Sequence, residues 1–164
     1  MEKIKNNLVF RSTLINGDKD VISDIVTSTG FFNVEEVSVA VELAVETLSS
    51  GQKSGYNFIF AELDGKVAGY CCFGRIPGTK NSFDLYWIVV HCDYQRSGIG
   101  AALLKNVEDF INTSGGGRIY IETSSRKQYE PTRDFYIRSG YFQEALLTGF
   151  YDDLDHKIIY SKNI

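Results

Sequence analysis

The stretch YWIVVHCDYQRSGIGAALLKNVEDF, residues 86–110, decides the fold. It begins as a run of β-branched and aromatic residues, which favours a strand. It ends as an amphipathic helix, because apolar residues recur near one face at helical spacing: Ile99, Ala102, Leu103, Val107 and Phe110. Between them lies the polar turn QRSGIG, residues 95–100. The sequence therefore predicts a strand that passes into a helix through a turn with two glycines.

The segments on either side of this stretch read as short strands and helices. Strands are predicted at 8–14, 56–63, 66–74, 82–90, 118–124, 141–150 and 156–162. Asp64-Gly65 suits a tight hairpin turn between the second and third of them. Helices are predicted at 18–30, from 34 to about 50, at 98–113 and at 131–140. The first has Asp18 as its cap and Gly30 as its stop. The second buries one stripe: Val34, Val37, Val41, Ala44, Val45 and Leu48.

This order, β-α-α-β-β-β-α-β-α-β-β, predicts an α/β (α+β) fold with a mixed sheet and helices on both faces. A β-meander comes before a βαβ crossover that is built on residues 86–110. The chain has 164 residues and no repeat or proline-rich linker, so one continuous domain, residues 1–164, is the simplest expectation.

Composition narrows the classes of function. Hydrophobic residues make up 43% and charged residues 23%, as in an ordinary globular protein, and no apolar run is long enough to cross a bilayer. Residues 1–12, MEKIKNNLVFRS, lack the features of a signal peptide, so we expect a cytoplasmic protein with no membrane partner. The net charge of −4, without a basic block, argues against nucleic acid. Cys71, Cys72 and Cys92 form no CxxC, and His91 and His156 lack metal-ligand spacing, so we expect no metal.

The glycine turn has the features of an anion site. A helix N-terminus offers unpaired N–H groups and partial positive charge, and Gly98 and Gly100 permit close approach beside Arg96. A sharp turn that merely needs glycine is the alternative. The dinucleotide fingerprint fails because Leu103 stands where a third glycine is needed, and no P-loop occurs.

Two segments resemble the GNAT superfamily of acyl-CoA N-acyltransferases. VHCDYQRSGIGAALL, residues 90–104, is similar to the signature V-x-P-x-[YF]-[QR]-x-x-G-x-[GA]-x-x-L-[LM], and TRDFYIRSGYF, residues 132–142, is similar to A-x-x-[FL]-Y-x-x-x-GF. The order of the elements matches the family over nearly the whole chain. The resemblance implies a mostly antiparallel sheet of about seven strands, splayed at a central parallel pair, with about four helices.

The resemblance also implies acetyl-CoA, or coenzyme A, as the ligand. Its pyrophosphate would bind the backbone of Gln95, Arg96, Ser97, Gly98, Ile99, Gly100 and Ala101. Its pantetheine would pair with the strand edge at Ile88, Val89 and Val90, between that strand and the one at 118–123. Further contacts are expected from the second segment and the strand before it: Thr123, Ser124, Tyr129, Thr132, Phe135 and Tyr136. Cys92, Tyr129 and Thr132 depart from the residues usual in the family, which bears on how the pantetheine is held.

The same resemblance suggests roles in acetyl transfer to an amine. A backbone N–H near Val89 would polarise the thioester, and Tyr136 would donate a hydrogen bond to the departing thiolate unless a lowered pKa allows it to transfer its proton. A core-facing aromatic of the helix is the alternative for Tyr136. Asp84 or Glu122 would accept the amine proton, unless a water relay or an already neutral amine makes both unnecessary. A merely solvated or ion-paired carboxylate is the alternative for each.

The expected function is N-acetylation of a primary amine on a small molecule or peptide. Phe31, Phe32 and Tyr151 would wall the acceptor pocket, and nearby acidic side chains would attract a cation: Glu35, Glu36, Asp152, Asp153 and Asp155. A merely solvated acidic surface is the alternative for these five residues. A non-catalytic acyl-CoA-binding or regulatory module on the same fold is the competing interpretation. An exposed late strand leaves a homodimer open.

Overall fold

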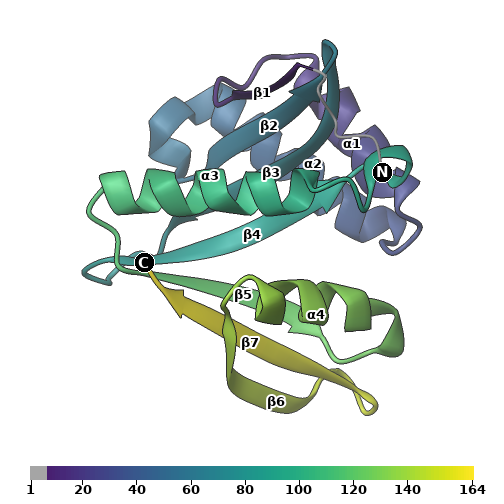
Figure 1. The fold of residues 1–164 in the computed structure, drawn as a ribbon, viewed down its shortest axis with the longest axis vertical. Helices are drawn as coiled ribbons and strands as arrows, with labels where there is room; N and C mark the ends of the chain where they lie inside the picture. Colours follow the sequence, from purple (N-terminus) through teal and green to yellow (C-terminus); the bar gives the residue numbers. More distant parts are fainter. Residues whose placement is uncertain (1–6) are drawn as a thin grey trace. The chain divides into compact units, whose positions relative to one another are not determined.

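The structure is a computed structural model that describes residues 7–164. Residues 1–6, half of the segment 1–12 whose sequence predicts no signal peptide, lie outside the described part. The elements follow the predicted order: β1 Leu8–Arg11, α1 Asp18–Ser28, α2 Val34–Ser50, β2 Asn57–Leu63, β3 Lys66–Arg75, β4 Ser82–Val90, α3 Ile99–Thr113, β5 Arg118–Ser124, α4 Glu130–Arg138, β6 Phe142–Asp152 and β7 Asp155–Asn163 (Figure 1). Within residues 7–164, three short 3-10 helices occur at Gly51–Ser54 (η1), Cys92–Tyr94 (η2) and Lys127–Tyr129 (η3).

The strands form one seven-stranded sheet in the order β1-β2-β3-β4-β5-β7-β6. Strands β4 and β5 are parallel, with Ser82 opposite Arg118 and Leu85 opposite Ile121. The pairs β1-β2, β2-β3, β5-β7 and β6-β7 are antiparallel. This confirms the predicted mixed, mostly antiparallel sheet. In the described residues, 7 to 164, no helix combines the length and apolar character that a membrane span requires.

The chain divides into two compact units, which we describe separately. Unit 1 comprises the chain up to Gly74 together with Trp87–Val107, and unit 2 comprises Arg75–Tyr86 with Glu108–Ile164. Both β4 and α3 contribute residues to each unit. The expectation of a single domain stays a prediction.

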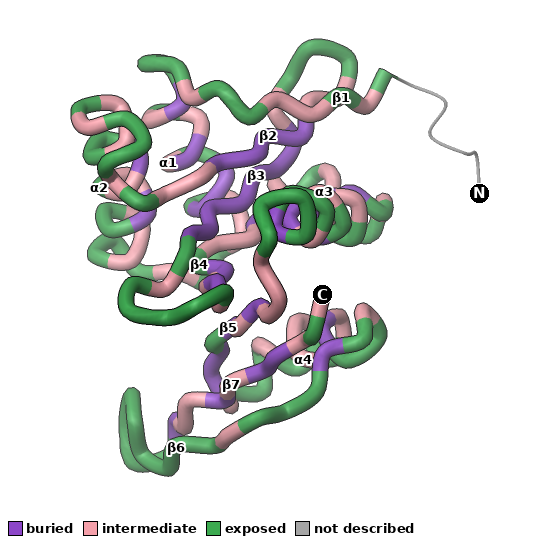
Figure 2. The backbone as a smooth tube through the Cα atoms, turned by 90° about the vertical axis from the view of Figure 1, so that its left-hand side faces the viewer, coloured by how far each residue is buried: buried purple, intermediate pink, exposed green. Residues whose placement is uncertain are grey.

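Unit 1 has helices on both faces of its strands. Tyr70 and Cys72 of β3 pack with α1 and α2 in one core, whose fully buried members include Ile22, Val26 and Ala44. Residues of β3 alternate between the two faces, so Gly69 faces the other way and lies against Leu103 of α3. Figure 2 shows β2 and β3 as the most continuously buried strands of this unit.

Two details of the helices in unit 1 differ from expectation. Asp18 does not cap α1, because Gly17 is the N-cap and the buried Asp18 carboxylate accepts hydrogen bonds from Arg11, at 2.8 and 2.9 Å. Helix α2 begins with a capping box in which Asn33 and Glu36 bond reciprocally. Its fully buried positions are Ala40 and Ala44, whereas the side chains of Val34 and Val45 are 87% and 47% exposed. The buried face therefore keeps Val37, Val41 and Ala44 of the predicted stripe and leaves out Val34 and Val45.

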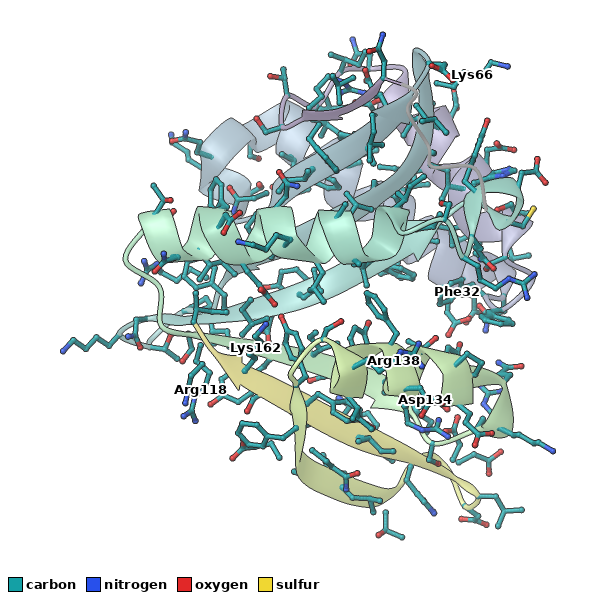
Figure 3. The ribbon with its side chains drawn as sticks, in the orientation of Figure 1. Phe32, Lys66, Arg118, Asp134, Arg138 and Lys162 are labelled. Atoms are coloured by element: carbon teal, nitrogen blue, oxygen red, sulfur yellow. The ribbon has the colours of Figure 1, made fainter. Side chains whose placement is uncertain are left out.

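Unit 2 has α4 on one face of its strands. Tyr136 of α4 packs against Tyr160 of β7, with ring centroids 5.9 Å apart, and Tyr160 stands opposite Ile121 of β5. Lys162 of β7 (Figure 3) links three elements of the unit. Its ammonium donates to Glu108 of α3 at 2.8 Å and to the carbonyl of Ser139, just after α4, at 2.9 Å. The outermost strand, β6, is exposed along nearly its whole length (Figure 2).

Candidate active site

The turn before α3 has the backbone of an anion site. Arg96 and Gly98 both have positive φ, 59° and 88°, so two left-handed residues stand either side of Ser97. The first backbone bond into the helix runs from the N–H of Ala102 to the carbonyl of Gly98, at 3.0 Å. The N–H groups of Ile99, Gly100 and Ala101 therefore have no acceptor within α3, and they carry the positive end of the helix dipole.

Side chains hold the shape of this turn. Ser97 donates its hydroxyl to the Tyr94 carbonyl, and the Gln95 amide donates to the Val90 carbonyl at 3.1 Å. Ile99 is buried and anchors the start of the helix. A Cβ added to Gly98 would meet no protein atom within 4 Å, so the backbone of the turn is not crowded at this residue. This arrangement leaves the backbone N–H groups and the exposed Arg96 available to a ligand.

The end of β4 is held against a glycine that the sequence analysis did not single out. A Cβ on Gly69 would lie 2.8 Å from the Val89 carbonyl oxygen and 3.2 Å from the Val90 Cα. The N–H of His91 donates to the Ala68 carbonyl at 2.9 Å, which ties the same segment to β3. Absence of a side chain at Gly69 thus sets how closely β3 and the Val89–Val90 backbone approach.

In unit 2 the two predicted carboxylates lie on one face. Asp84 stands opposite Tyr120, and Glu122 is two residues farther along β5, so both share a face. Burial raises the pKa of the Asp84 carboxyl above its ordinary value, and the charge of Glu122 raises it further, while Lys157 partly opposes the shift. Lys157 forms an ion pair with Glu122 at 2.8 Å and lies 3.7 Å from the centre of the Phe150 ring. Nothing in the sequence indicated Lys157, because the register of β7 against β5 creates this pair.

Tyr136 lies on the opposite face of the unit 2 strands. Because Tyr160 pairs with Ile121, the face that contacts Tyr136 is not the face of Asp84 and Glu122. Tyr136 is 4% exposed, and burial raises the pKa of its phenol well above the ordinary value. The hydroxyl therefore stays protonated in the accessible pH range and is suited to donate a hydrogen bond.

The other predicted residues of unit 2 surround the start of α4. Thr123 and Ser124 end β5, Tyr129 lies in η3, and Thr132 and Phe135 are in α4. The Ser124 hydroxyl donates to the carboxylate of Asp155 and also accepts the N–H of Arg126, so the side chain of Ser124 is already occupied.

Two of the acidic residues expected at the acceptor pocket have structural partners. Asp155 is 5% exposed and forms an ion pair with Arg126 at 2.9 Å, in addition to its bond with Ser124. Glu36 accepts the N–H of Asn33 in the capping box of α2. Neither carboxylate is a freely solvated charge that would simply attract a cation.

Comparison with known proteins identifies the family of the chain. The profile of the acetyltransferase (GNAT) family matches residues 27–141. A crystal structure of a GNAT-family protein from Desulfovibrio desulfuricans superposes with a TM-score of 0.94, at 43% identity, covering 96% of this chain and 99% of that one. A protein of Methanocaldococcus jannaschii, named as an uncharacterized N-acetyltransferase, is 33% identical over 106 residues, 64% of this chain and 65% of that protein. The PaiA N-acetyltransferase of Thermoplasma acidophilum, solved in complex with coenzyme A, has a TM-score of 0.73 at 19% identity, covering 96% of this chain and 99% of that one.

The fold and the glycine turn thus define a protein of the acetyltransferase class. The extent of the profile match makes the assignment specific: the chain belongs to the GNAT family of acetyltransferases.

Proposed function

We propose that this protein transfers an acetyl group from acetyl-CoA to a primary amine of a small molecule or peptide. The observation that carries the proposal is the start of α3, where the N–H groups of Ile99 to Ala101 have no acceptor within the helix and the exposed Arg96 lies just before them, in a chain of the GNAT family. A structural relative, the Thermoplasma acidophilum enzyme, is a coenzyme A complex. A pyrophosphate is the group of acetyl-CoA that fits such a helix start.

The end of β4 supplies the contacts proposed for pantetheine. The Val89 carbonyl lies against Gly69, and the N–H of His91, two residues farther along, donates to the Ala68 carbonyl of β3. Successive residues of a regular strand turn their backbone polar groups to opposite sides, so those of Ile88 and Val90 point away from β3. We assign the pantetheine amides and the developing oxyanion to Ile88 and Val90. We thus propose Ile88 or Val90 as the oxyanion donor in place of the expected N–H of Val89.

Amine attack needs a proton acceptor, and we assign that role to Asp84 ahead of Glu122. Its raised pKa makes its carboxylate a stronger base than an ordinary one. Glu122 already pairs with Lys157 at 2.8 Å, which occupies one of its oxygens. In the proposed step the amine nitrogen bonds to the acetyl carbon, the carbon–sulfur bond breaks, and the amine proton passes to Asp84 directly or through water.

Tyr136 is assigned to the departing thiolate as a hydrogen-bond donor. Full proton transfer is unfavourable, because burial raises the pKa of the phenol and a thiol has a pKa of only about 8.5. A donated hydrogen bond needs no transfer and still stabilises the negative sulfur. The placement of Tyr136 and Asp84 on opposite faces of the unit 2 strands suits two groups that serve different atoms, the leaving sulfur and the attacking nitrogen.

The test is release of coenzyme A thiol from acetyl-CoA across a panel of amines. Tyr136→Phe is expected to lower kcat by about 10- to 100-fold at unchanged acetyl-CoA affinity, as loss of one transition-state hydrogen bond does. Tyr141→Phe is the matched control, because that hydroxyl donates to Glu108 at 3.1 Å and has no proposed catalytic role. Equal turnover in Tyr136→Phe and the wild type would remove Tyr136 from the mechanism.

The same assay separates an enzyme from an acyl-CoA-binding module. A binding module would take up acetyl-CoA in calorimetry and release no thiol with any amine. Binding absent at millimolar acetyl-CoA would exclude both interpretations and leave the glycine turn as a structural feature only.

A further inference from the structure

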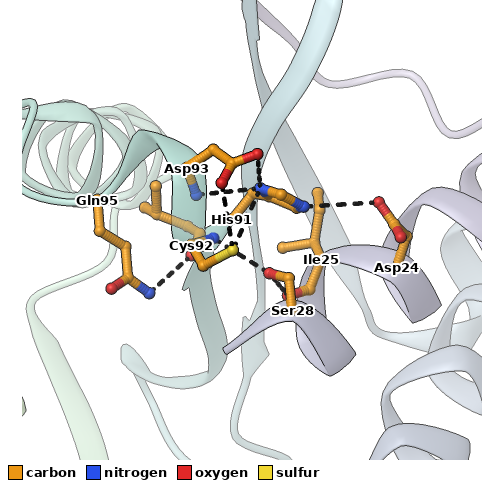
Figure 4. A network of polar contacts seen from close by, with 8 residues as sticks. Asp24, Ile25, Ser28, His91, Cys92, Asp93 and Gln95 are labelled. Carbon is orange, nitrogen blue, oxygen red and sulfur yellow. Dashed lines mark hydrogen bonds and ion pairs between the residues drawn. The ribbon is translucent and has the colours of Figure 1, made fainter. Parts of the chain in front are cut away.

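We propose that His91, Cys92 and Asp93 form a binding site for a divalent transition metal ion of the zinc class. The three residues follow β4 directly and include the start of η2, all within unit 1 (Figure 4). One donor atom from each lies within 4.8 Å of the other two. The inference does not depend on acetyl transfer, and it replaces the expectation, based on the absence of CxxC and on histidine spacing, that the chain holds no metal.

The donor atoms have nearly the spacing of one face of a tetrahedral site. The Cys92 Sγ lies 3.9 Å from the His91 Nδ1 and 3.6 Å from the Asp93 Oδ1, and the Asp93 Oδ2 lies 3.7 Å from the same nitrogen. Zinc bonds of about 2.0–2.3 Å at tetrahedral angles place such donors roughly 3.4–3.6 Å apart. Small rotations of the side chains are enough to close the remaining difference and to present one Asp93 oxygen to the ion.

The contacts of the His91 ring favour the tautomer that binds a metal through Nδ1. The backbone N–H of Asp93 donates to the Nδ1 at 3.2 Å, so in the neutral ring Nδ1 carries the lone pair and Nε2 carries the proton. The Nε2 faces the Asp24 carboxylate of α1 at 3.8 Å. Metal-bound histidines commonly direct their second N–H at such a carboxylate, which orients the ring and raises its basicity. A bound ion would replace the backbone N–H of Asp93 as the partner of the Nδ1 lone pair.

The backbone of the site is fixed by neighbouring elements. The N–H of Cys92 donates to the Ser28 hydroxyl of α1 at 3.1 Å, and that hydroxyl donates to the Ile25 carbonyl at 2.7 Å. The N–H of His91 is bonded to β3, as described above. The three side chains are therefore presented from an anchored turn, which limits the entropy lost when an ion binds.

The donor set selects the class of ion. Thiolate and imidazole favour zinc, cobalt, nickel and copper, whereas calcium and magnesium prefer oxygen ligands. Cys92 is exposed, while Cys71 and Cys72 are fully buried and burial raises the pKa of both their thiols. Any thiolate–metal bond in the folded chain must therefore come from Cys92.

The test is titration of the folded, full-length protein with Co²⁺, with zinc added afterwards as competitor. Wild type is expected to bind one ion and to develop thiolate-to-cobalt charge-transfer absorption that zinc abolishes. Cys92→Ser is expected to remove that absorption, and His91→Gln to weaken binding by about 10- to 100-fold. Asp24→Asn is expected to weaken it by about tenfold, at the low end of such outer-ligand effects. Asp20→Asn on the exposed side of α1 and His156→Gln are matched controls that leave the titration unchanged.

Two results would overturn the proposal. One is absence of the charge-transfer absorption in wild type at millimolar Co²⁺. The other is equal cobalt affinity in wild type, Cys92→Ser and Asp24→Asn, which would identify unspecific surface binding. Because His91 also accepts a bond within its own turn, circular dichroism must show each variant folded. Cys92→Ser, which leaves that bond intact, is the decisive variant.

Discussion

Gly69→Ala is expected to weaken the fold of unit 1 and the binding of acetyl-CoA together. The new Cβ would lie 2.8 Å from the Val89 carbonyl oxygen, 3.2 Å from the Val90 Cα and 3.3 Å from the Leu103 side chain. The first two contacts are with backbone, which cannot rotate away. The end of β4 must therefore shift by about half an ångström, and overpacking of this kind typically costs about 1–3 kcal/mol.

Urea unfolding followed by circular dichroism measures this cost. For a chain of this size, about 1–3 kcal/mol corresponds to a fall in Tm of roughly 2–12 °C. Gly17→Ala is the matched control, because Gly17 has an ordinary φ of −67° and a Cβ there meets no atom within 4 Å. We expect that control to stay within about 0.5 kcal/mol of wild type.

Calorimetry with acetyl-CoA supplies the functional readout. A shift of the Val89–Val90 backbone moves the groups proposed to meet pantetheine, so Gly69→Ala is expected to raise Kd while Gly17→Ala does not. A Gly69→Ala protein as stable as the control would refute the steric argument. A destabilised protein with unchanged acetyl-CoA affinity would instead refute the assignment of pantetheine to this end of β4.

Three other outcomes follow from the geometry. Asp84→Asn should lower kcat by about 10²- to 10⁴-fold if Asp84 is the base, whereas Asp134→Asn on the exposed side of α4 should not. Because the pKa of Asp84 is raised in the folded state, ionisation of Asp84 destabilises the native chain, and stability is lost as pH rises through the folded pKa. Urea unfolding should therefore find Asp84→Asn more stable than wild type above that pKa, and as stable as wild type below about 3.8. Arg96→Gly should weaken coenzyme A binding roughly tenfold or more, because it removes a charged contact. The free energy of unfolding should stay within about 1 kcal/mol of wild type, because glycine tolerates the φ of 59°. Unchanged affinity would contradict a role for Arg96 at the phosphates.

Local sequence patterns predicted the elements well where a local rule decides them. Asp64-Gly65 both adopt positive φ, 51° and 79°, as the tight hairpin requires, and β5 has the predicted bounds. The glycine turn was predictable because positive φ favours glycine and because a helix start has a recognisable sequence pattern. Helix α2 shows the limit of such rules. Its apolar residues cover more than one face, and the small Ala40 and Ala44 form the close contact with the core.

Pairings that depend on strand register were not predictable from one sequence. The contact between Lys157 and Glu122 joins residues 35 positions apart, because Ser124 happens to stand opposite Lys157. The carboxylate of Asp18 was expected to cap a helix, but the approach of Arg11 from β1 gave it a stronger partner. Likewise, His91 acquires its outer carboxylate from α1, 67 positions away.

The exposed outer strand β6 has a consequence for solubility and assembly. Among the described strands it pairs only with β7, so its other edge offers free backbone groups to a second chain. Register breaks between Gln143 and Ala145 and between Leu147 and Asp152 leave only Ala145–Leu147 as a regular run between them. Such a short run gives little template for continuous edge-to-edge pairing, which protects the chain against open-ended aggregation. Any homodimer at this edge would then depend on exposed apolar side chains such as Phe142 and Phe150 more than on shared backbone hydrogen bonds.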